Sequence, residues 1–241
     1  MNFYNQISTM KSNWSKISVL KIKNNFRIYL DDKPLKTIEK NDFEFQNKKI
    51  VNLVKKEITQ LKEKDFIKIN DCFYFNILSF CFDKIKNDRD RYLNDIFKYC
   101  NTDLICYRAE KPQDLVNLQN KYWDPVLIKL NSMGLKFKSF YGVMPKKQLS
   151  ITIKKFKTEL HQLGDIELAC LFKLTQTLGS VLLSYSLLKN QFNCKFIFEC
   201  SVLDEKWQSK QWGEVEESLE RFQKTYLFIK KIKNLLDILA K

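Results

Sequence analysis

The sequence predicts an α+β protein: a small N-terminal β-containing domain with flanking helices, followed by an all-helical, orthogonal bundle-like C-terminal domain. Short, strand-like apolar runs between residues 17 and 45 indicate a hairpin. Beyond Gly142 no strand pattern returns, and apolar residues recur at helical spacing to the C-terminus. We therefore expect an N-terminal domain over residues 1–141, with the hairpin, helices and two further short strands, and a C-terminal domain over residues 142–241. At 241 residues the chain is long enough for a substantial core.

The N-terminal elements follow from apolar spacing. Residues 17–22 and 26–30 are β-like runs, and the turn Asp31–Pro34 with Leu35 and Thr37 follows them, a pattern that indicates a hairpin. Between residues 48 and 64 the apolar side chains recur every three to four residues, which predicts an amphipathic helix. The aromatic run of residues 72–85 fits a buried strand or a helix by periodicity, and its length favours a helix. Residues 88–100 predict one more helix.

Residues 103–141 are predicted to contain both short strands and helices. Residues 103–109 predict a short strand, and Lys111-Pro112 predicts the first turn of the next helix. Asp124-Pro125 is expected to interrupt that helix, because proline lacks the N–H that continues the hydrogen-bond ladder. Its second piece should end at Gly134, and the alternation in residues 135–141 predicts a strand.

The remaining chain predicts helices only. The first covers residues 149–163 and ends before Gly164, and Asp165 is expected to cap a helix over residues 166–178. Further helices are predicted over residues 181–188 and 192–203, and a long one over residues 215–239.

The charge leaves a nucleic-acid-binding protein as the alternative function. A formal net charge of +14 attracts anionic partners such as nucleic acid. The excess is nearly all lysine, however, with five arginines in the chain. Arginine is the residue better suited to bidentate phosphate recognition. Nucleic acid is therefore not the partner that we expect.

The sequence argues against catalysis and against cofactors. It contains no P-loop, GxGxxG or GxSxG motif, and its carboxylate pairs are adjacent in sequence, so they do not face each other. We expect no cofactor, no metal and no small-molecule substrate. The seven cysteines include no CxxC pair and are expected to be buried free thiols in a reducing compartment.

The N-terminal residues 1–22 lack the features of a secretory signal or a transit peptide, so a bacterial cytoplasm is expected, with the mitochondrial matrix as the alternative. The most apolar stretch, residues 168–188, is broken by Lys173 and Gln176, so insertion into a membrane is not expected.

Two sequence blocks resemble a known family. The first is TDLICYRAEKP at residues 102–112, followed by Gln119 and WDP at residues 123–125. The second is DEKWQ at residues 204–208, followed by Trp212-Gly213. Both resemble the assembly chaperone of the α subunit of the mitochondrial F1-ATPase and its bacterial counterparts. Looser matches at residues 29–37 and at Gly142 and Gln148 extend the resemblance over roughly residues 26 to 220.

The chain also departs from the family pattern. The proline-rich stretch after Thr37 is absent, and the usual Glu-Trp pair of the first helix appears as Glu57-Ile58. The segment 72–83 keeps none of the family's small and polar residues. Contacts made by that segment in other members therefore do not carry over.

The resemblance implies an ATP-independent chaperone that binds the unassembled α subunit of F-type ATP synthase and delivers it for assembly with β. A monomer is expected. Tryptophans and a carboxylate around a glycine are residues that protein interfaces favour as anchors. The expected partner-binding residues are Glu205, Trp207, Gln208, Trp212, Gly213 and Glu216, with Arg108 and Asp124 supporting the shape of a groove.

Two of these motifs also have a purely structural interpretation. Tyr107 and Arg108 fit a core aromatic side chain and a solvated guanidinium. Trp123-Asp124-Pro125 fits an indole that fills the core beside a helix break.

Overall fold

A computed structural model describes residues 9–11, 14–61, 66–68, 71–142, 144, 146–213 and 216–240. The chain divides into two compact units. The first comprises residues 1–88 together with residues 234–241, and the second comprises residues 89–233. The boundary expected from the sequence, at residues 141 and 142, lies within the second unit.

The first unit contains the predicted hairpin, but the turn expected at Asp31–Pro34 spans only residues 31–32 and follows the second strand, because the first two strands join at residues 23–24. Strand β2 (Ile17–Ile22) pairs antiparallel with β3 (Asn25–Leu30), with Ile17 opposite Leu30. Strand β3 also pairs with β4 (Lys33–Pro34) and with β5 (Glu44–Phe45). Strands β1 (Thr9–Lys11) and β6 (Phe66–Lys68) form a separate antiparallel pair.

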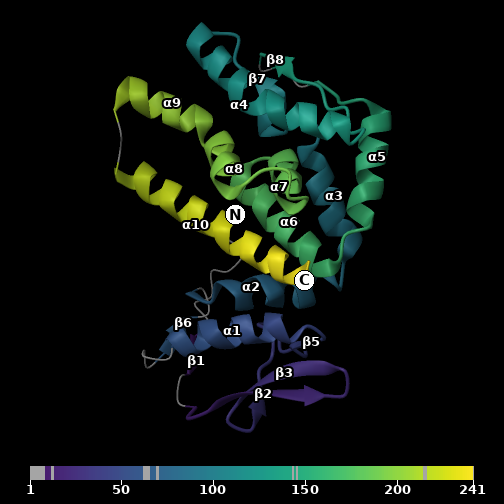
Figure 1. The fold of residues 1–241 in the computed structure, drawn as a ribbon, viewed down its shortest axis with the longest axis vertical. Coiled ribbons are helices and arrows are strands. Elements are labelled where there is room, and N and C mark those ends of the chain that lie inside the picture. The colour runs from purple at the N-terminus through teal and green to yellow at the C-terminus, as the bar shows by residue number, and fades with distance from the viewer. Residues whose placement is uncertain are drawn as a thin grey trace. The chain divides into compact units, whose positions relative to one another are not determined.

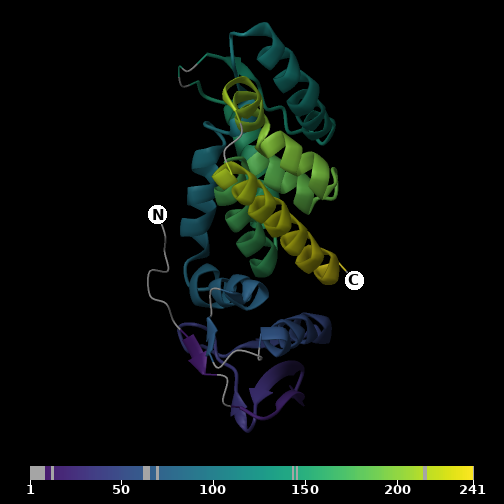
Figure 2. The same ribbon diagram turned by 90° about the vertical axis from the view of Figure 1, so that its left-hand side faces the viewer.

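Helix α1 (Lys48–Leu61) lies between the β2–β3 hairpin and helix α2 (Phe73–Phe80) (Figures 1 and 2). Both helices confirm the sequence predictions. The chain continues from α2 into a π-helical turn at Cys81–Ile85. A cluster of phenylalanine rings joins residues 43–45, α2 and this turn, with centroid separations of 4.9 to 6.0 Å: Phe43, Phe45, Phe75 and Phe82.

The described part of the second unit is mainly helical. Its helices are α3 (Arg89–Tyr99), α4 (Gln113–Ser132), α5 (Ser150–His161), α6 (Asp165–Leu178), α7 (Val181–Leu188), α8 (Cys194–Ser201), α9 (Leu203–Trp212) and α10 (Glu216–Leu239). Helix α10 ends in the first unit. Every residue of α7 is buried, because α4, α6 and α8 pack around it (Figure 1). The predicted α+β fold class is confirmed.

The predicted interruption of α4 is wrong. The helix continues through Pro125 from Gln113 to Ser132. Pro125 is exposed, so the carbonyl oxygen that it leaves unpaired can accept a hydrogen bond from water. Buried Trp123, Val126 and Leu130 on the opposite face hold the helix in place on both sides of the proline.

Two strand predictions are correct only for part of their length. In residues 103–109, Leu104–Cys106 form a 3₁₀ turn because the Asp103 carboxylate accepts a hydrogen bond from the Ile105 N–H, and only Tyr107–Arg108 form strand β7. In residues 135–141, only Phe140–Tyr141 form strand β8, parallel to β7. The sequence pattern marks buried positions correctly, but pairing with another strand is a tertiary event that the pattern does not contain.

The cap predicted at Asp165 is displaced by one residue. Gly164 occupies the N-cap of α6, and the Glu167 carboxylate accepts a hydrogen bond from its N–H at 2.8 Å. Asp165 instead pairs with Arg89 of α3. The predicted start of the long helix at Val215 lies outside the described residues.

Candidate partner-binding groove

Helix α9 carries most of the residues that the sequence analysis assigned to partner binding, and its helical conformation is not among the sequence predictions. A change of direction at Val202, where φ is −112°, separates it from α8. Among the residues of α9 only Leu203 is buried, and Gln208, Lys210, Gln211 and Trp212 are exposed. The helix ends at Gly213, where φ is +97°, a conformation that strongly favours glycine.

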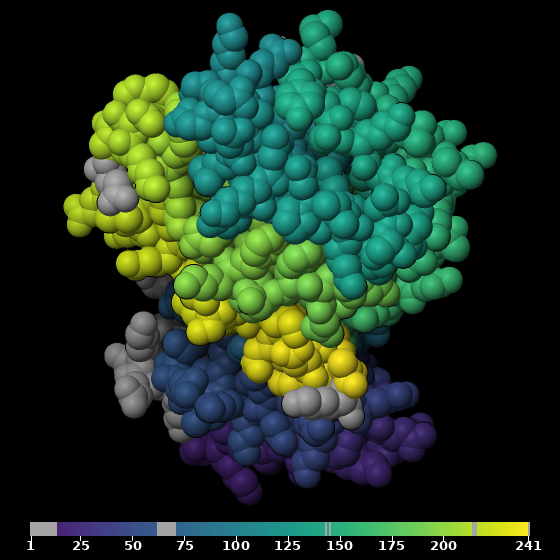
Figure 3. Space-filling model, turned by 45° about the horizontal axis from the view of Figure 1, so that its top comes forward, coloured from purple at the N-terminus to yellow at the C-terminus, as the bar shows by residue number. Residues whose placement is uncertain are grey.

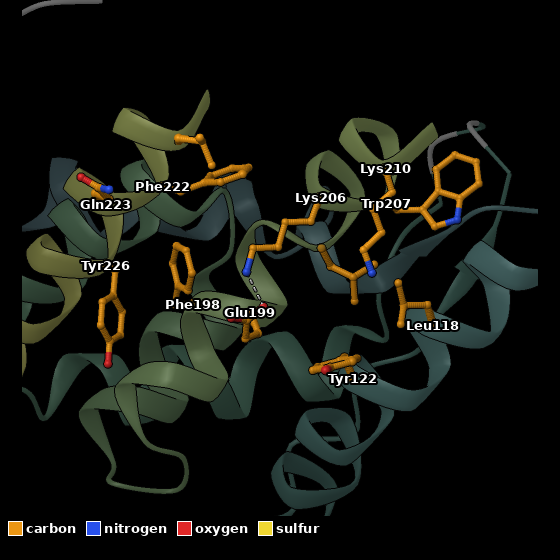
Figure 4. Close-up of a pocket in the computed structure, with 12 residues that line it drawn as sticks. Leu118, Tyr122, Phe198, Glu199, Lys206, Trp207, Lys210, Phe222, Gln223 and Tyr226 are labelled. Atoms are coloured by element: carbon orange, nitrogen blue, oxygen red, sulfur yellow. Dashed lines mark hydrogen bonds and ion pairs between the residues drawn. The ribbon is translucent and has the colours of Figure 1, made fainter. Parts of the chain in front are cut away.

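A groove of about 610 Å³ lies between α9 and its neighbours α4, α8 and α10 (Figure 4). Apolar and aromatic side chains make up most of its wall. The lining residues are Leu118, Tyr122, Phe198, Glu199, Leu203, Lys206, Trp207, Lys210, Leu219, Phe222, Gln223 and Tyr226.

Aromatic rings on α8 and α10 form one side of this groove. The Phe198 ring centroid lies 6.3 Å from that of Phe222 and 5.3 Å from that of Tyr226. Phe222 and Tyr226 are four residues apart and therefore share one face of α10. The Lys206 ammonium lies 4.9 Å from the Phe198 centroid and pairs with the Glu199 carboxylate at 2.7 Å, so its charge is largely compensated.

Trp207 connects α9 to α4. Its indole Nε1–H donates a hydrogen bond to the Asp114 carboxylate at 2.9 Å, which fixes the ring at the edge of the groove. Trp212 stacks edge-to-face against Trp207 with centroids 6.3 Å apart, and 77% of its surface is exposed. A large exposed indole held by a fixed one is suited to burial by a partner.

Charged residues border the groove. The Glu205 carboxylate pairs with the Arg221 guanidinium and thereby links α9 to α10. Gln208, Gly213 and Glu216 are exposed. An exposed ion pair of this kind contributes little to folding stability, so its side chains remain available to a partner.

Arg108 and Asp124 do not line the groove. The Arg108 side chain is fully buried, and its guanidinium donates to Asp124 at 2.8 Å and lies 5.1 Å from the Trp123 ring centroid. Burial lowers the pKa of Arg108, and the nearby Asp124 carboxylate opposes that shift. The solvated guanidinium that the structural interpretation described is therefore not observed.

Side chains of the first sequence block bind the second block and helix α8. Gln119 accepts a hydrogen bond from the Ala109 N–H and donates one to Asp204, each at 2.8 Å. Burial raises the pKa of the Asp204 carboxyl. The Trp123 indole donates to the Cys200 carbonyl at 2.9 Å. These contacts hold α4, α8 and α9 together and so set the geometry of the groove.

Of the residues assigned from the sequence, only Trp207 lines the groove, and Glu205 lies at its border. Sequence analysis did not identify the aromatic side of the groove, which Phe198, Phe222 and Tyr226 form. Spacing could have indicated Phe222 and Tyr226, which lie on one face of the long predicted helix. No local signal brings Phe198 of α8 to the same place, because that contact is tertiary.

Of the seven cysteines, six are buried, as predicted, and Cys194 is half-buried. Burial raises the pKa of Cys72, Cys100 and Cys200 to about 12, far from the range of a reactive thiolate. Within the described ranges, no group of three or more potential ligands gathers for a metal ion. Likewise, none of the described helices is long and apolar enough to cross a membrane.

Comparison with known proteins identifies a family. Residues 2–131 match the family described as ATP12 chaperone protein. The chain belongs to this family. Two Atp12 structures from Paracoccus denitrificans, one of them a point mutant, superpose with TM-scores of 0.86 and 0.87 at 21% and 20% identity. Each superposition covers 95% of this chain and 97% of the other. The Atu1473 protein of Agrobacterium tumefaciens, described as a putative chaperone, superposes with a TM-score of 0.88 at 30% identity, over 96% of this chain and 87% of that one.

The family assignment confirms the resemblance drawn from the two sequence blocks. The matched range ends at Asn131 on α4, before α8, α9 and α10, while the structural likeness extends over nearly the whole chain. Most residues that line the groove therefore lie outside the range that matches the family. For these residues, the superposed structures provide the comparison with known proteins.

Proposed function

We propose that this member of the ATP12 chaperone family binds the unassembled α subunit of F-type ATP synthase and delivers it for assembly with β, without ATP and without catalysing a reaction. The observation that carries the proposal is the aromatic groove that Trp207 of the second sequence block lines. The groove is open, apolar and bordered by charged residues, the arrangement expected of a protein-binding surface.

The physical reason for such a chaperone lies in the subunit that it would protect. Obligate subunit interfaces commonly bury more than about 2,000 Å² of largely apolar surface, so an unpaired subunit exposes a patch that promotes aggregation. A protein that covers this patch lowers the concentration of the exposed form by mass action alone. No energy source is needed, in keeping with the absence of a nucleotide-binding motif from the sequence.

Release would follow from competition. If β covers part of the same surface and binds more tightly, it displaces the chaperone. A groove of about 610 Å³ suits this role. It can cover a few anchor side chains of the α subunit, while the remaining interface surface of the α subunit stays accessible to β. The aromatic wall would bind those anchors, and Trp212 would be buried alongside them.

The test is a binding measurement between the purified chain and unassembled α subunit from the same source. We expect Trp207→Ala to weaken binding about 10- to 100-fold, because buried aromatic anchors carry much of the binding free energy of an interface. Glu205→Lys should weaken it as well, because a lysine would face Arg221 and place two positive charges at the groove border.

The matched control is Leu227→Ala, which truncates an exposed apolar side chain of α10 that does not line the groove. This variant should bind the α subunit as tightly as the wild-type chain does. If the groove variants bind the α subunit as tightly as the original chain does, the groove assignment is contradicted. Absence of binding to the α subunit, together with salt-sensitive binding to nucleic acid, would instead favour the alternative function.

A further inference from the structure

A second surface of the second unit is strongly basic. From Pro125 to Thr158 the sequence holds eight lysines and neither an aspartate nor a glutamate. These lysines are Lys129, Lys136, Lys138, Lys146, Lys147, Lys154, Lys155 and Lys157, all of which are exposed. None of them lines the groove, and the proposal above does not account for them.

Specific contacts place residues 136–138, which carry Lys136 and Lys138, beside the start of α5, which carries Lys154. The Gln148 side chain accepts a hydrogen bond from the Lys138 N–H and donates one to the Lys138 carbonyl, each at 2.8 Å. Thr152 of α5 donates to the Lys136 carbonyl at 3.1 Å, and the Phe137 ring packs against Phe156 at 5.4 Å. The extended residues 136–138 therefore lie along the start of α5, and Figure 3 shows the sea-green atoms of this segment as one continuous region of the surface.

Apolar side chains protrude from the same region. Met144 is 72% exposed and Ile151 is 74% exposed. Tyr141 and Leu149 are 49% and 41% exposed. We name this surface the basic face and define it by Lys136, Lys138, Lys146, Lys147, Lys154, Tyr141, Met144, Leu149 and Ile151.

Acidic side chains near the basic face do not neutralise it. Glu110 lies beside Gly142 at its border, where a Cβ atom on the glycine would come within 3.1 Å of the carboxylate. Glu159, the first acidic residue after the segment, accepts a hydrogen bond from the Tyr185 hydroxyl. Within the described residues, Lys138, Lys147 and Lys154 have no carboxylate within ion-pair distance.

We infer that the basic face binds peripherally to the surface of an anionic lipid bilayer. Lysines attract anionic headgroups through charge alone, and their long aliphatic stems lie along apolar material while the ammonium stays in water. Isolated aliphatic side chains such as Ile151 and Met144 enter the interfacial layer between headgroups. A fluid bilayer adapts to such separate projections, whereas a folded acidic protein would have to present a matching cavity for each.

This contact differs from insertion of a helix and involves a surface separate from the groove. The absence of arginine from the basic face also favours lipid over nucleic acid, since bidentate phosphate recognition depends on the guanidinium. Peripheral binding of this kind would bring the chain close to a membrane without anchoring it there.

Flotation of the full chain with lipid vesicles tests the inference. We expect the chain to float with vesicles of phosphatidylcholine and phosphatidylglycerol, to remain unbound with phosphatidylcholine alone, and to dissociate in high salt. Reversal of three charges in Lys138→Glu, Lys147→Glu and Lys154→Glu should lower the partition coefficient at least about 100-fold. Ile151→Ser, which keeps every charge, should lower it about 5- to 10-fold.

The charge-matched control is Lys33→Glu, Lys49→Glu and Lys56→Glu, which changes the net charge by the same amount at exposed positions of the first unit. It should float like the original chain. Equal loss in both triple variants would overturn the inference, because net charge and not the basic face would then explain binding. No flotation with anionic vesicles would overturn it as well, and so would selective binding of nucleic acid or of an acidic protein by the basic face in place of vesicles.

Discussion

At the scale of single residues, buried polar side chains have the clearest physical roles. Asp103 is fully buried and accepts hydrogen bonds from the Ser180 hydroxyl at 2.7 Å, from the Leu182 N–H at 3.0 Å and from the Ile105 N–H at 3.2 Å. The carboxylate thereby joins the 3₁₀ turn before β7 to the start of α7. Burial nevertheless raises the pKa of Asp103 to about 6, because the loss of water disfavours the charged form.

The raised pKa of Asp103 predicts how the free energy of unfolding depends on pH. An aspartate in the unfolded chain has its ordinary pKa of about 4, so between about pH 4 and pH 6 the folded state holds more protons than the unfolded state. The contribution of Asp103 to stability is therefore fully present below about pH 4 and is lost as the pH rises through about 6. Relative to Asp103→Asn, we expect the wild-type free energy of unfolding to fall by about 3 kcal/mol from about pH 4 to about pH 7.

Urea unfolding of both proteins at each pH would measure this difference. The comparison removes the contributions of other titrating groups, which both chains share. A difference between the two free energies that stays constant over this pH range would show that the carboxyl does not change protonation on unfolding there.

At the scale of elements, one helix fixes the start of another. Helix α2 begins after Cys72, whose side chain makes no capping hydrogen bond. The Glu57 carboxylate of α1 takes that role, because it accepts hydrogen bonds from the N–H groups of Tyr74 and Phe75 at 3.0 to 3.1 Å. A cap supplied from a different helix couples the formation of α2 to the packing of α1.

We therefore expect Glu57→Ala to destabilise the protein by about 2 kcal/mol, because it leaves two N–H groups at the helix start without their acceptor. Chemical unfolding would measure the change. Gln60→Ala, at an exposed position of the same helix, should change stability by less than about 0.5 kcal/mol. Equal effects of the two substitutions would argue against the cap.

At the scale of the whole molecule, the last residues of the chain complete the first unit. Leu235 and Leu236 of α10 are buried there, and Asn234 donates a hydrogen bond to the Tyr74 hydroxyl at 3.0 Å. The Asn47 side chain also donates to the Ile238 carbonyl at 3.3 Å. The first unit is therefore incomplete until the end of the chain has folded.

Truncation of Leu235 tests this dependence. We expect Leu235→Ala to cost about 3 kcal/mol and to raise hydrogen exchange in α1 and α2, while α6 and α7 of the second unit keep their protection. Leu227→Ala, at a position of α10 that is 52% exposed, should leave both units unchanged. A uniform rise in exchange over both units would show that α10 stabilises the chain as a single cooperative body.

The sequence by itself determined the fold class, most helices and the family. Apolar spacing depends only on neighbouring residues, so α1, α3, α6 and α7 could be predicted from it. The blocks around Arg108 and Trp207 indicated the family as short runs of letters, and the structure gives them a shared physical role, because Gln119 and Asp204 bind each other.

Tertiary structure decided what local patterns do not contain. Packing around Trp123 kept α4 helical through Pro125. The Gln148 side chain forms hydrogen bonds with the N–H and the carbonyl of Lys138, which the strand pattern had predicted to pair with another strand. The groove exists because Phe198 and Tyr226, which lie on different helices, meet at 5.3 Å. Contacts between residues distant in sequence depend on how whole elements pack, and that packing decides which side chains form a surface.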